Sequence, residues 1–293
     1  MSSDFIYALY LTFAQSIFTN RFVFIDMSEA EAIFQTPSPR TRASLATDLR
    51  QLGLIPGAIV LVHSSLKSLG WVCGGSVTVI QAFMDVLTTI GTLVMPSHSG
   101  DYSDPAEWQN PPVPSEWVQI IRDTMPAFDA RLTPTRGMGK IAEAFRTFPE
   151  VVRSSHPTSS FAAWGKYAPD IINNHSLDYS LGNESPLARL YDLNASVVLL
   201  GVGYDSNTCF HLAEYRTTKV KQITQGSPIT EEGQRVWKTY KDVEFNWECF
   251  EEMGTAFEEA GYVKSSNVGN APTRLFLIKS AVDWAASWLE KKS

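Results

Sequence analysis

Cysteine is scarce in this chain of 293 residues, and runs of basic residues are absent. The three cysteines, Cys73, Cys209 and Cys249, lie far apart in the sequence, which excludes a disulfide framework and a cysteine-based zinc site. Unclustered cysteines favour a reducing compartment, so we expect a cytoplasmic protein. The formal net charge of −7 and the lack of a Lys/Arg run disfavour a nucleic-acid partner, whereas an acidic surface suits a cationic ligand.

Several motifs that identify common enzyme classes are also missing. The sequence has no G-x-x-x-x-G-K-[ST] loop, no G-x-S-x-G nucleophile elbow and no H-E-x-x-H motif. Segment 137–142 (GMGKIA) fits G-x-G-x-x-A but follows no strand-like run, and Ser206 occupies the third glycine position of the pattern that begins at Gly201. A dinucleotide-binding fold is therefore disfavoured. We also expect no metal, because His211-x-x-Glu214 has no second histidine one turn away.

The N-terminal segment 5–25 is almost wholly apolar but unlike a signal peptide. It lacks a basic start and a small-residue cleavage site, and Arg21 would be costly inside a bilayer. Met27 is followed by a polar, acidic stretch typical of a soluble start. We therefore expect residues 1–26 to be a non-native or disordered extension, residues 27–293 to form one domain, and no membrane partner. A membrane anchor is the competing interpretation.

Alternating strand and helix patterns predict an α/β protein. Segment 58–62 (AIVLV) is typical of a buried strand, 77–88 of a helix and 91–95 (GTLVM) of the next strand, which together make a βαβ unit. Residues 231–247 look polar and irregular. Further helices are predicted at 42–52, 115–123, 140–148, 250–260 and 281–291, and a further strand at 274–279.

The segment 197–216 (VVLLGVGYDSNTCFHLAEYR) carries the strongest functional signal. A buried strand turns at two glycines, passes through a loop that contains Asp205, and enters a predicted helix with His211 and Glu214. Residues three apart share one face of a helix. The pair would stand beyond the carboxyl end of a strand, where α/β sheets bind ligands. A carboxylate beside an imidazole stabilises the imidazolium, which a general base requires.

The strand at 58–62 leads into Ser64 and Ser65, and a second small-residue cluster follows at 74–76 (GGS). Backbone N–H groups at such a helix start can bind a phosphate group, and a pyrophosphate would suit both clusters. Helix capping by serine explains the same pattern without a ligand.

Histidines and acidic residues gather in predicted loops and at strand ends. All five histidines stand beside polar or loop residues, which suggests that some converge on one cleft: His63, His98, His156, His175 and His211. The acidic set forms either a solvated surface or a negative cleft for a polycation: Asp101, Asp104, Glu107, Asp178, Glu184, Asp205 and Glu214.

Taken in order, these segments resemble the aminoglycoside N3-acetyltransferase family from about Ser44 to Leu289. The long loop that begins at Asp101 resembles the loop of a chromosomal Gram-positive subgroup of this family. The segments that carry it are 63–66 (HSSL) with 70–71 and 74–75, 91–96 (GTLVMP), 104–105, 133–139 (TPTRGMG), 153–157 (RSSHP), 160–165 (SFAAWG), 181–187, and 201–208 (GVGYDSNT) with 211–214 (HLAE).

The resemblance implies transfer of an acetyl group from acetyl-CoA to the 3-amino group of a 2-deoxystreptamine antibiotic, with no metal. It makes His211 the catalytic base, with Glu214 and Asp205 orienting it or binding the amine. At the coenzyme it places Ser64, Ser65 and Leu66 on the pyrophosphate, Arg136, Met138 and Gly139 along the pantetheine arm, and Phe161 and Ala162 at the acyl end. At the cationic acceptor it places Asp104, His156, His175, Asp178 and Glu184.

The implied fold is a single three-layer α/β domain with a mixed, largely parallel central sheet flanked by helices, distinct from the small acetyltransferase fold. We expect the oxyanion to be held near Ser65 or Ser160, and Cys209 to be a packing residue. The segment 174–177 (NHSL) departs from the family's usual His-Pro, which leaves the role of His175 open. A homodimer is left open as well. The alternatives are an acyltransferase for a different amine, a CoA-binding protein without an acceptor, and a serine hydrolase that uses Ser64 or Ser65.

Overall fold

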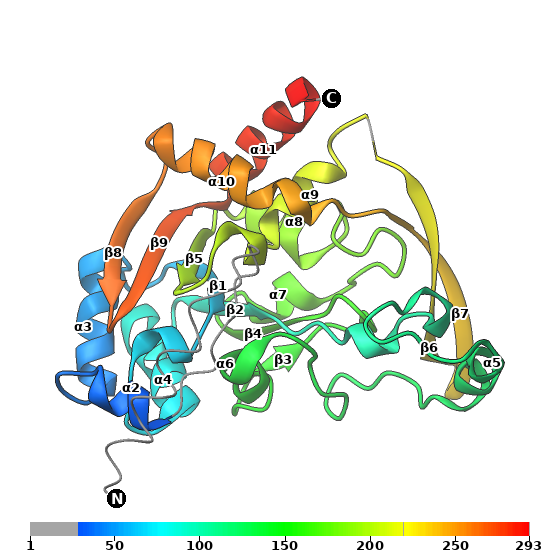
Figure 1. Ribbon diagram of the computed structural model, residues 1–293, viewed down its shortest axis with the longest axis horizontal. Helices are drawn as coiled ribbons and strands as arrows, with labels where there is room; N and C mark the ends of the chain where they lie inside the picture. Colours follow the sequence, from blue (N-terminus) through cyan, green and yellow to red (C-terminus); the bar gives the residue numbers. More distant parts are fainter. Residues whose placement is uncertain (1–28, 219, 293) are drawn as a thin grey trace, which may run out of the picture.

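The computed structural model describes residues 29–218 and 220–292. Its main sheet has seven strands in the order β3-β4-β2-β1-β5-β9-β8 (Figure 1), and a separate hairpin forms a second sheet. The strands are β1 (Ile59–Ser64), β2 (Thr92–Pro96), β3 (Val152–Arg153), β4 (Phe161–Gly165), β5 (Ser196–Leu200), β6 (Gln222–Glu231), β7 (Gln234–Val243), β8 (Lys264–Val268) and β9 (Ala271–Leu277).

The helices pack on both faces of the main sheet. The α-helices are α2 (Glu29–Phe34), α3 (Arg42–Leu52), α4 (Gly75–Leu87), α5 (Ser115–Thr124), α6 (Gly139–Phe145), α7 (Ala168–Ile172), α8 (Pro186–Asp192), α9 (Cys209–Glu214), α10 (Phe250–Glu259) and α11 (Ile278–Lys292). Single 3₁₀ turns are η1 (Lys67–Leu69), η2 (Gly100–Tyr102), η3 (Pro105–Glu107), η4 (Tyr204–Ser206) and η5 (Trp247–Cys249).

Parallel pairing is confined to the centre of the sheet. Strand β1 pairs in parallel with β2 on one side and with β5 on the other, and β1, α4 and β2 form the predicted βαβ unit. Strands β3, β4, β8 and β9 all join by antiparallel pairing. The sheet is mixed and flanked by helices, as expected, but it is less parallel than expected.

Alternation along the central strand divides the core into two layers. Val60 and Val62 of β1 face one hydrophobic cluster, which includes residues of α3, α4 and α6. Leu61 faces the other, which includes residues of α7, α8, α9, α10 and α11. Successive side chains of a strand point to opposite faces of its sheet. A strand covered on both faces therefore reads as the continuous apolar run seen in the sequence.

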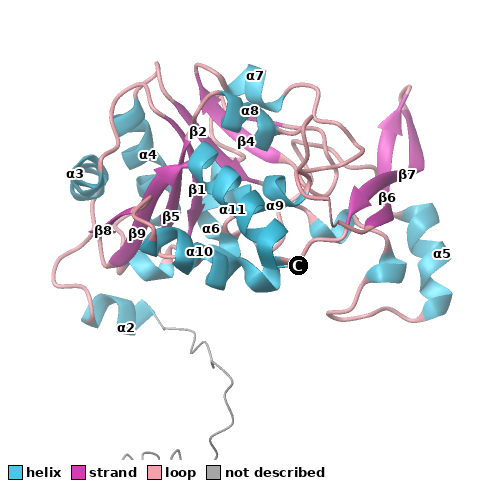
Figure 2. Cartoon of the chain, turned by 90° about the horizontal axis from the view of Figure 1, so that it is seen from above, coloured by secondary structure: helices cyan, strands magenta, loops and turns pink. Residues whose placement is uncertain are grey.

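The region 231–247 is not irregular, so that interpretation was wrong. Strands β6 and β7 form a long antiparallel hairpin, which lies with α5 at one end of the molecule (Figures 1 and 2). Its two turn residues, Glu232 and Gly233, both have positive φ, the geometry of the tight turn that suits strand twist. Each strand of a two-stranded ribbon is an edge, so Pro228 inside β6 is tolerated.

Residues 1–26, expected to be an extension of the domain, lie outside the described part of the chain. Among residues 29–218 and 220–292, no helix has the length and apolar character needed to cross a bilayer.

We predict that Gly254→Ala destabilises the protein. In most helix interiors this change stabilises by about 0.5–1 kcal/mol. At Gly254 of α10, however, a Cβ atom would stand 2.0 Å from the Tyr204 ring, which is fully buried. We expect a loss of about 1–3 kcal/mol, as for other overpacked cores, measured by urea unfolding. The control is Gly100→Ala, where nothing lies within 4 Å of the added atom. Equal stability of the two variants would contradict the packing argument.

Candidate active site

The carboxyl ends of the three central parallel strands open onto one cavity of about 840 Å³, within the range of about 300–1,000 Å³ usual for small-molecule sites. Three histidines line it: His63 near the end of β1, His98 just after β2, and His211 on α9, the helix that follows β5. Parallel strands bring their carboxyl ends to the same edge of a sheet. The topology therefore brings together histidines that are up to 148 positions apart (211 minus 63).

His211 and Glu214 form the predicted pair on one face of α9. The Nδ1 atom of His211 lies 2.6 Å from Oε2 of Glu214, and their side chains are 16% and 5% exposed. The other carboxylate oxygen of Glu214 accepts a hydrogen bond from the backbone N–H of Asn246 at 2.7 Å. The rings of Phe245 and Phe250 pack against the imidazole at 4.3 and 4.9 Å between centroids. Both members of the pair are therefore fixed in place.

This geometry also assigns the two ring nitrogens of His211. Because a carboxylate can only accept, Nδ1 carries the hydrogen that Glu214 binds. In the neutral ring the lone pair then lies on Nε2. The arrangement can accept a proton at Nε2 while the carboxylate stabilises the positive charge that results.

His63 and His98 line the cavity, and the sequence assigned neither of them a role. Burial, together with the nearby charge of His211, lowers the pKa of His63 to about 3 and that of His98 to about 3. The Nε2 atom of each ring is buried and has no hydrogen-bond partner among the described residues, at a cost of about 1–3 kcal/mol each. The sequence feature that could have identified these two histidines is their position at the ends of two predicted strands.

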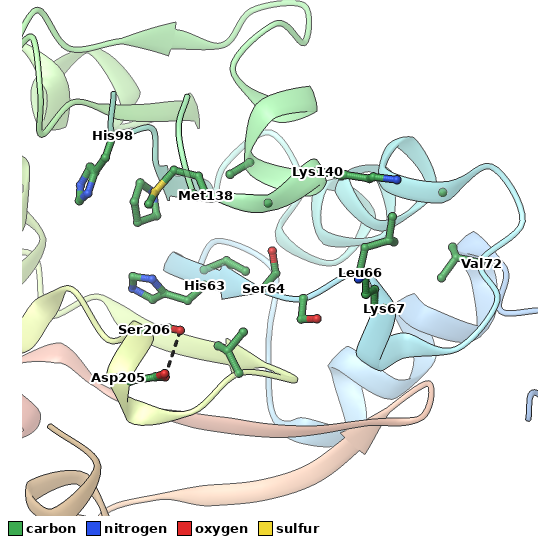
Figure 3. Close-up of a pocket in the computed structure, with 18 of the residues that line it drawn as sticks. His63, Ser64, Leu66, Lys67, Val72, His98, Met138, Lys140, Asp205 and Ser206 are labelled. Atoms are coloured by element: carbon green, nitrogen blue, oxygen red, sulfur yellow. Dashed lines mark hydrogen bonds between the residues drawn. The ribbon is translucent and has the colours of Figure 1, made fainter. Parts of the chain in front are cut away.

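The other end of the cavity is basic. Lys67 and Lys140 lie there, across the cavity from the rings of His63 and His98 (Figure 3). Gly75, the first residue of the 13-residue helix α4, also lines the cavity. A helix start carries unsatisfied N–H groups and partial positive charge. This end of the cavity can therefore hold an anionic group.

The residues expected at the coenzyme separate into two groups. Five of them line the cavity: Ser64, Ser65, Leu66, Met138 and Gly139. The helix start expected after the serines is the single 3₁₀ turn η1, and the Ser65 N–H donates to the Leu200 carbonyl at 2.9 Å. That N–H is therefore engaged in holding β1 to β5, while Ser64, Ser65 and Leu66 still line the cavity, so their role at a phosphate stays a prediction.

Three other expected coenzyme residues do not line this cavity. Arg136 is exposed and forms an ion pair with Asp101 at 2.5 Å. Phe161 and Ala162 are 0% exposed, because β4 is paired on both sides and its side chains pack into the two core clusters. Neither presents a surface to a bound acyl group, so direct contact of Phe161 and Ala162 with it is not supported.

The acidic residues expected at the acceptor are dispersed. Asp205 lines the cavity, but its carboxylate accepts from Ser206 and makes no hydrogen bond with His211. Asp104 is held by a bidentate pair with Arg122, 2.7 Å at its shortest contact. Asp178 accepts from the backbone N–H of Lys241 in the hairpin, and Glu184 is exposed outside the cavity lining. The structure therefore does not gather these four carboxylates at one place.

His156 and His175 are structural in this fold rather than ligand-facing. They stack 4.9 Å apart and are nearly fully buried. The Nδ1 atom of His156 accepts from the backbone N–H groups of Thr158 and Ser159. His175 contacts the Ser154 hydroxyl at 2.9 Å and the Ser180 carbonyl at 2.6 Å. Both rings are thus satisfied by the protein, and the expectation that they bind the acceptor is corrected.

Two further features bear on the chemistry. Burial raises the pKa of the Cys209 thiol to about 12, which disfavours the thiolate that a covalent route would need. No hydrogen bond joins the hydroxyl of Ser64 or Ser65 to a histidine in the described part of the chain, as serine hydrolysis would require. Within residues 29–218 and 220–292, no group of three or more His, Cys, Asp or Glu side chains is arranged to bind a metal ion.

Fold and site together define an acyltransferase of a class distinct from the small acetyltransferase fold. The chain belongs to the aminoglycoside 3-N-acetyltransferase family, whose model matches residues 61–290. It is 56% identical over 254 residues to the SPbeta prophage-derived aminoglycoside N(3')-acetyltransferase-like protein YokD of Bacillus subtilis, covering 86% of this chain and 93% of that protein. The resemblance proposed from the sequence is confirmed.

Solved structures agree with this assignment. The crystal structure of YokD from Bacillus subtilis matches with a TM-score of 0.88 and 53% identity, over 89% of this chain and 97% of that one. AAC-IIIb in a binary complex with CoASH matches at 0.79 with 28% identity, over 87% and 98%. AAC-VIa bound to sisomicin matches at 0.79 with 28% identity, over 87% and 99%.

We predict that stability falls as the pH is lowered from about 6.5 to 4. Burial lowers the pKa of His175 from 6.5 to about 4 and that of His156 well below its usual value. The unfolded chain therefore binds protons at a higher pH than the native state, and the stability present above pH 6.5 is lost on acidification. Urea unfolding should show a shallower loss between pH 6.5 and 4 for His175→Gln than for the unmodified protein. Parallel pH profiles for the two would contradict this assignment.

Proposed function

We propose that the protein transfers an acetyl group from acetyl-CoA to the 3-amino group of a 2-deoxystreptamine aminoglycoside, with both substrates bound together. His211 is the general base, and Glu214 orients it. The observation that carries the proposal is the fixed His211–Glu214 pair on the wall of a cavity whose other end is basic. The family membership, and neighbours described with CoASH and with sisomicin, support the same assignment.

The cavity suits a coenzyme that is anionic at one end and reactive at the other. Lys67 and Lys140, with the start of α4, would hold phosphate groups. Met138 and Leu66 supply apolar surface between this end and the histidines. The two unpartnered ring nitrogens at the histidine end can form hydrogen bonds with polar atoms of a ligand. The thioester would then lie beside His211.

The chemical step follows from the charge of the acceptor. Aminoglycoside amines are mostly protonated at neutral pH, so the attacking nitrogen must lose a proton. The ammonium proton is released to solvent when the neutral amine binds. As the nitrogen bonds to the acetyl carbon, the Nε2 atom of His211 takes one of its two remaining protons, and the anchored Glu214 carboxylate stabilises the imidazolium. A well-placed base contributes a factor of about 10²–10⁴. Holding both reactants in contact contributes much of the remaining rate enhancement.

A different acceptor amine is the second candidate for this same site. It is favoured by one observation: Asp104, expected at the acceptor, is neutralised by Arg122, while His156 and His175 are satisfied by the protein itself. Asp205 and Glu29 are the acidic residues in the cavity lining, and the Glu29 carboxylate accepts a hydrogen bond from the Trp71 ring N–H at 3.2 Å. Release of thiol from acetyl-CoA, measured with gentamicin-, neomycin- and kanamycin-type drugs and with a panel of other amines, separates the two candidates.

We predict that His211→Ala lowers kcat by about 10²–10⁴-fold, because the proton acceptor is lost while the surrounding packing remains. Thiol release with the best amine measures the rate, and circular dichroism checks the fold. Cys209→Ser is the matched control on the same helix, and it should stay within about threefold of the unmodified enzyme. Wild-type turnover by His211→Ala would remove the general base from the proposal. Inactivity of a folded Cys209→Ser would indicate a covalent route.

We predict a comparable loss for Glu214→Gln. The new amide would keep the hydrogen bond from Asn246 but would turn its NH₂ group toward Nδ1 of His211. The imidazole would then carry its hydrogen on Nε2 and could not accept the proton, an effect worth up to about 10⁴-fold in other enzymes. Coenzyme affinity, measured by calorimetry, should stay unchanged. A kcat within threefold of the unmodified value would show that Glu214 does not set the tautomer.

A further inference from the structure

We propose that His63 is a second catalytic residue, whose neutral imidazole donates a hydrogen bond to the acetyl carbonyl oxygen as it becomes an oxyanion. This inference rests on the proposed function and adds a residue to which the family resemblance assigned no role. It stands on three observations: the position of the ring in the cavity, its unpartnered Nε2 atom, and the loss of the other expected donors.

The position of His63 comes from the central strand. In β1, His63 lies in register with Leu199 of β5, the strand that leads through η4 to the helix that carries His211. Both histidines line the same cavity, and the charge of His211 is close enough to affect the titration of His63. The ring lies at the end of the cavity opposite Lys140 (Figure 3). A donor at this place faces the reacting end of a coenzyme whose phosphates are held at the basic end.

The unpartnered nitrogen distinguishes His63 from a structural histidine. His156 and His175 show what a structural ring does in this protein, since both of their nitrogens are bonded to protein groups. The Nε2 atom of His63 is buried without any partner in the described part of the chain. In the tautomer that carries its hydrogen on Nε2, this N–H has no acceptor among the described residues and can donate to a ligand oxygen.

Two donors expected from the sequence, the Ser65 N–H and the Ser160 hydroxyl, are already occupied. The Ser65 N–H donates to the Leu200 carbonyl at 2.9 Å. Ser160 is fully buried, and its hydroxyl donates to the Ser97 carbonyl at 2.8 Å. Neither group can reach an oxyanion without breaking a hydrogen bond that holds the fold. The Nε2 atom of His98 in the same cavity is also unpartnered, and its ring lies edge-on against Phe161 at 5.4 Å.

The amine nitrogen forms a bond to the acetyl carbon, and the carbonyl π electrons move to oxygen, where the His63 N–H binds the new negative charge. The amine proton passes to Nε2 of His211. The oxyanion then collapses, the carbon–sulfur bond breaks, and the departing thiolate takes the proton from His211. A neutral donor suits this site because an imidazolium at His63 would repel the one that forms at His211.

Two substitutions and one spectroscopic measurement test the role of His63. His63→Phe keeps a ring but removes the donor, and it should lower kcat by about 10²–10³-fold, the usual effect of losing one oxyanion donor. The KM for acetyl-CoA and the calorimetric affinity for free CoA, which has no acetyl carbonyl, should stay within about threefold. His63→Gln restores an N–H donor and should recover at least about tenfold of the lost rate.

Isotope-edited infrared spectra of carbonyl-¹³C acetyl-CoA should show a lower carbonyl stretching frequency when it is bound than in buffer. This shift should disappear in His63→Phe.

Each outcome decides the proposal. A kcat near the unmodified value, equal loss in the Phe and Gln variants, or a matching loss of CoA affinity would overturn it. If His63→Phe does not fold, the infrared band of the unmodified protein decides alone, and a band at its buffer position overturns the role. If the unmodified protein acetylates no amine, the proposed function fails, while the infrared shift still tests the contact between His63 and the carbonyl.

Discussion

The parallel pairing of β1 with both β2 and β5 is the constraint on which the site depends. It brings the carboxyl ends of three strands to one edge, and each strand delivers one histidine to the same cavity. The pairing is completed beyond the strand itself, where the Ser65 N–H binds the Leu200 carbonyl. A change in register at β1 by one residue would exchange the two faces of the strand and move His63 to the side of the sheet that Val62 now faces. The continuous apolar character of β1 and β5 is thus also a condition for the chemistry.

Burial gives the five histidines different roles although their local sequences look alike. His63, His98, His156 and His175 are held neutral because the surrounding protein excludes water from their rings. His211 differs in having the Glu214 carboxylate at 2.6 Å, itself anchored by Asn246. One ring paired with a carboxylate among neutral ones suits the proposed uptake of a single proton, because no neighbouring imidazolium repels it. The division of labour therefore comes from partners and solvent access, not from residue type.

Local patterns predicted the fold well where one element determines its own contacts. The helix at 42–52 and the βαβ unit formed as expected, because apolar periodicity and the Gly53 stop act locally. The His211–Glu214 pair was predictable for the same reason, since spacing along one helix fixes their separation. Phe161, Ala162, Asp104, His156 and His175 were assigned through family resemblance, and their contacts are made across the tertiary fold with Arg122, Ser180 and the neighbouring strands. The hairpin at 222–243 was missed because its Glu-Gly turn lacks the more usual asparagine or aspartate.

The elements that surround the cavity differ in how closely they are tied to the central sheet. The reacting end of the cavity is built from the central strands, whose geometry is set by backbone hydrogen bonding and two core layers. Asp178 instead lies against the hairpin, where it binds the backbone of β7, and Asp104 belongs to the loop that pairs with α5. These peripheral elements sit at one end of the molecule, away from the main sheet (Figures 1 and 2). The His211–Glu214 pair is itself anchored from the end of this hairpin, since Asn246 donates to Glu214 and Phe245 packs on His211. Substitutions in the hairpin can therefore affect the pair as well as the peripheral carboxylates.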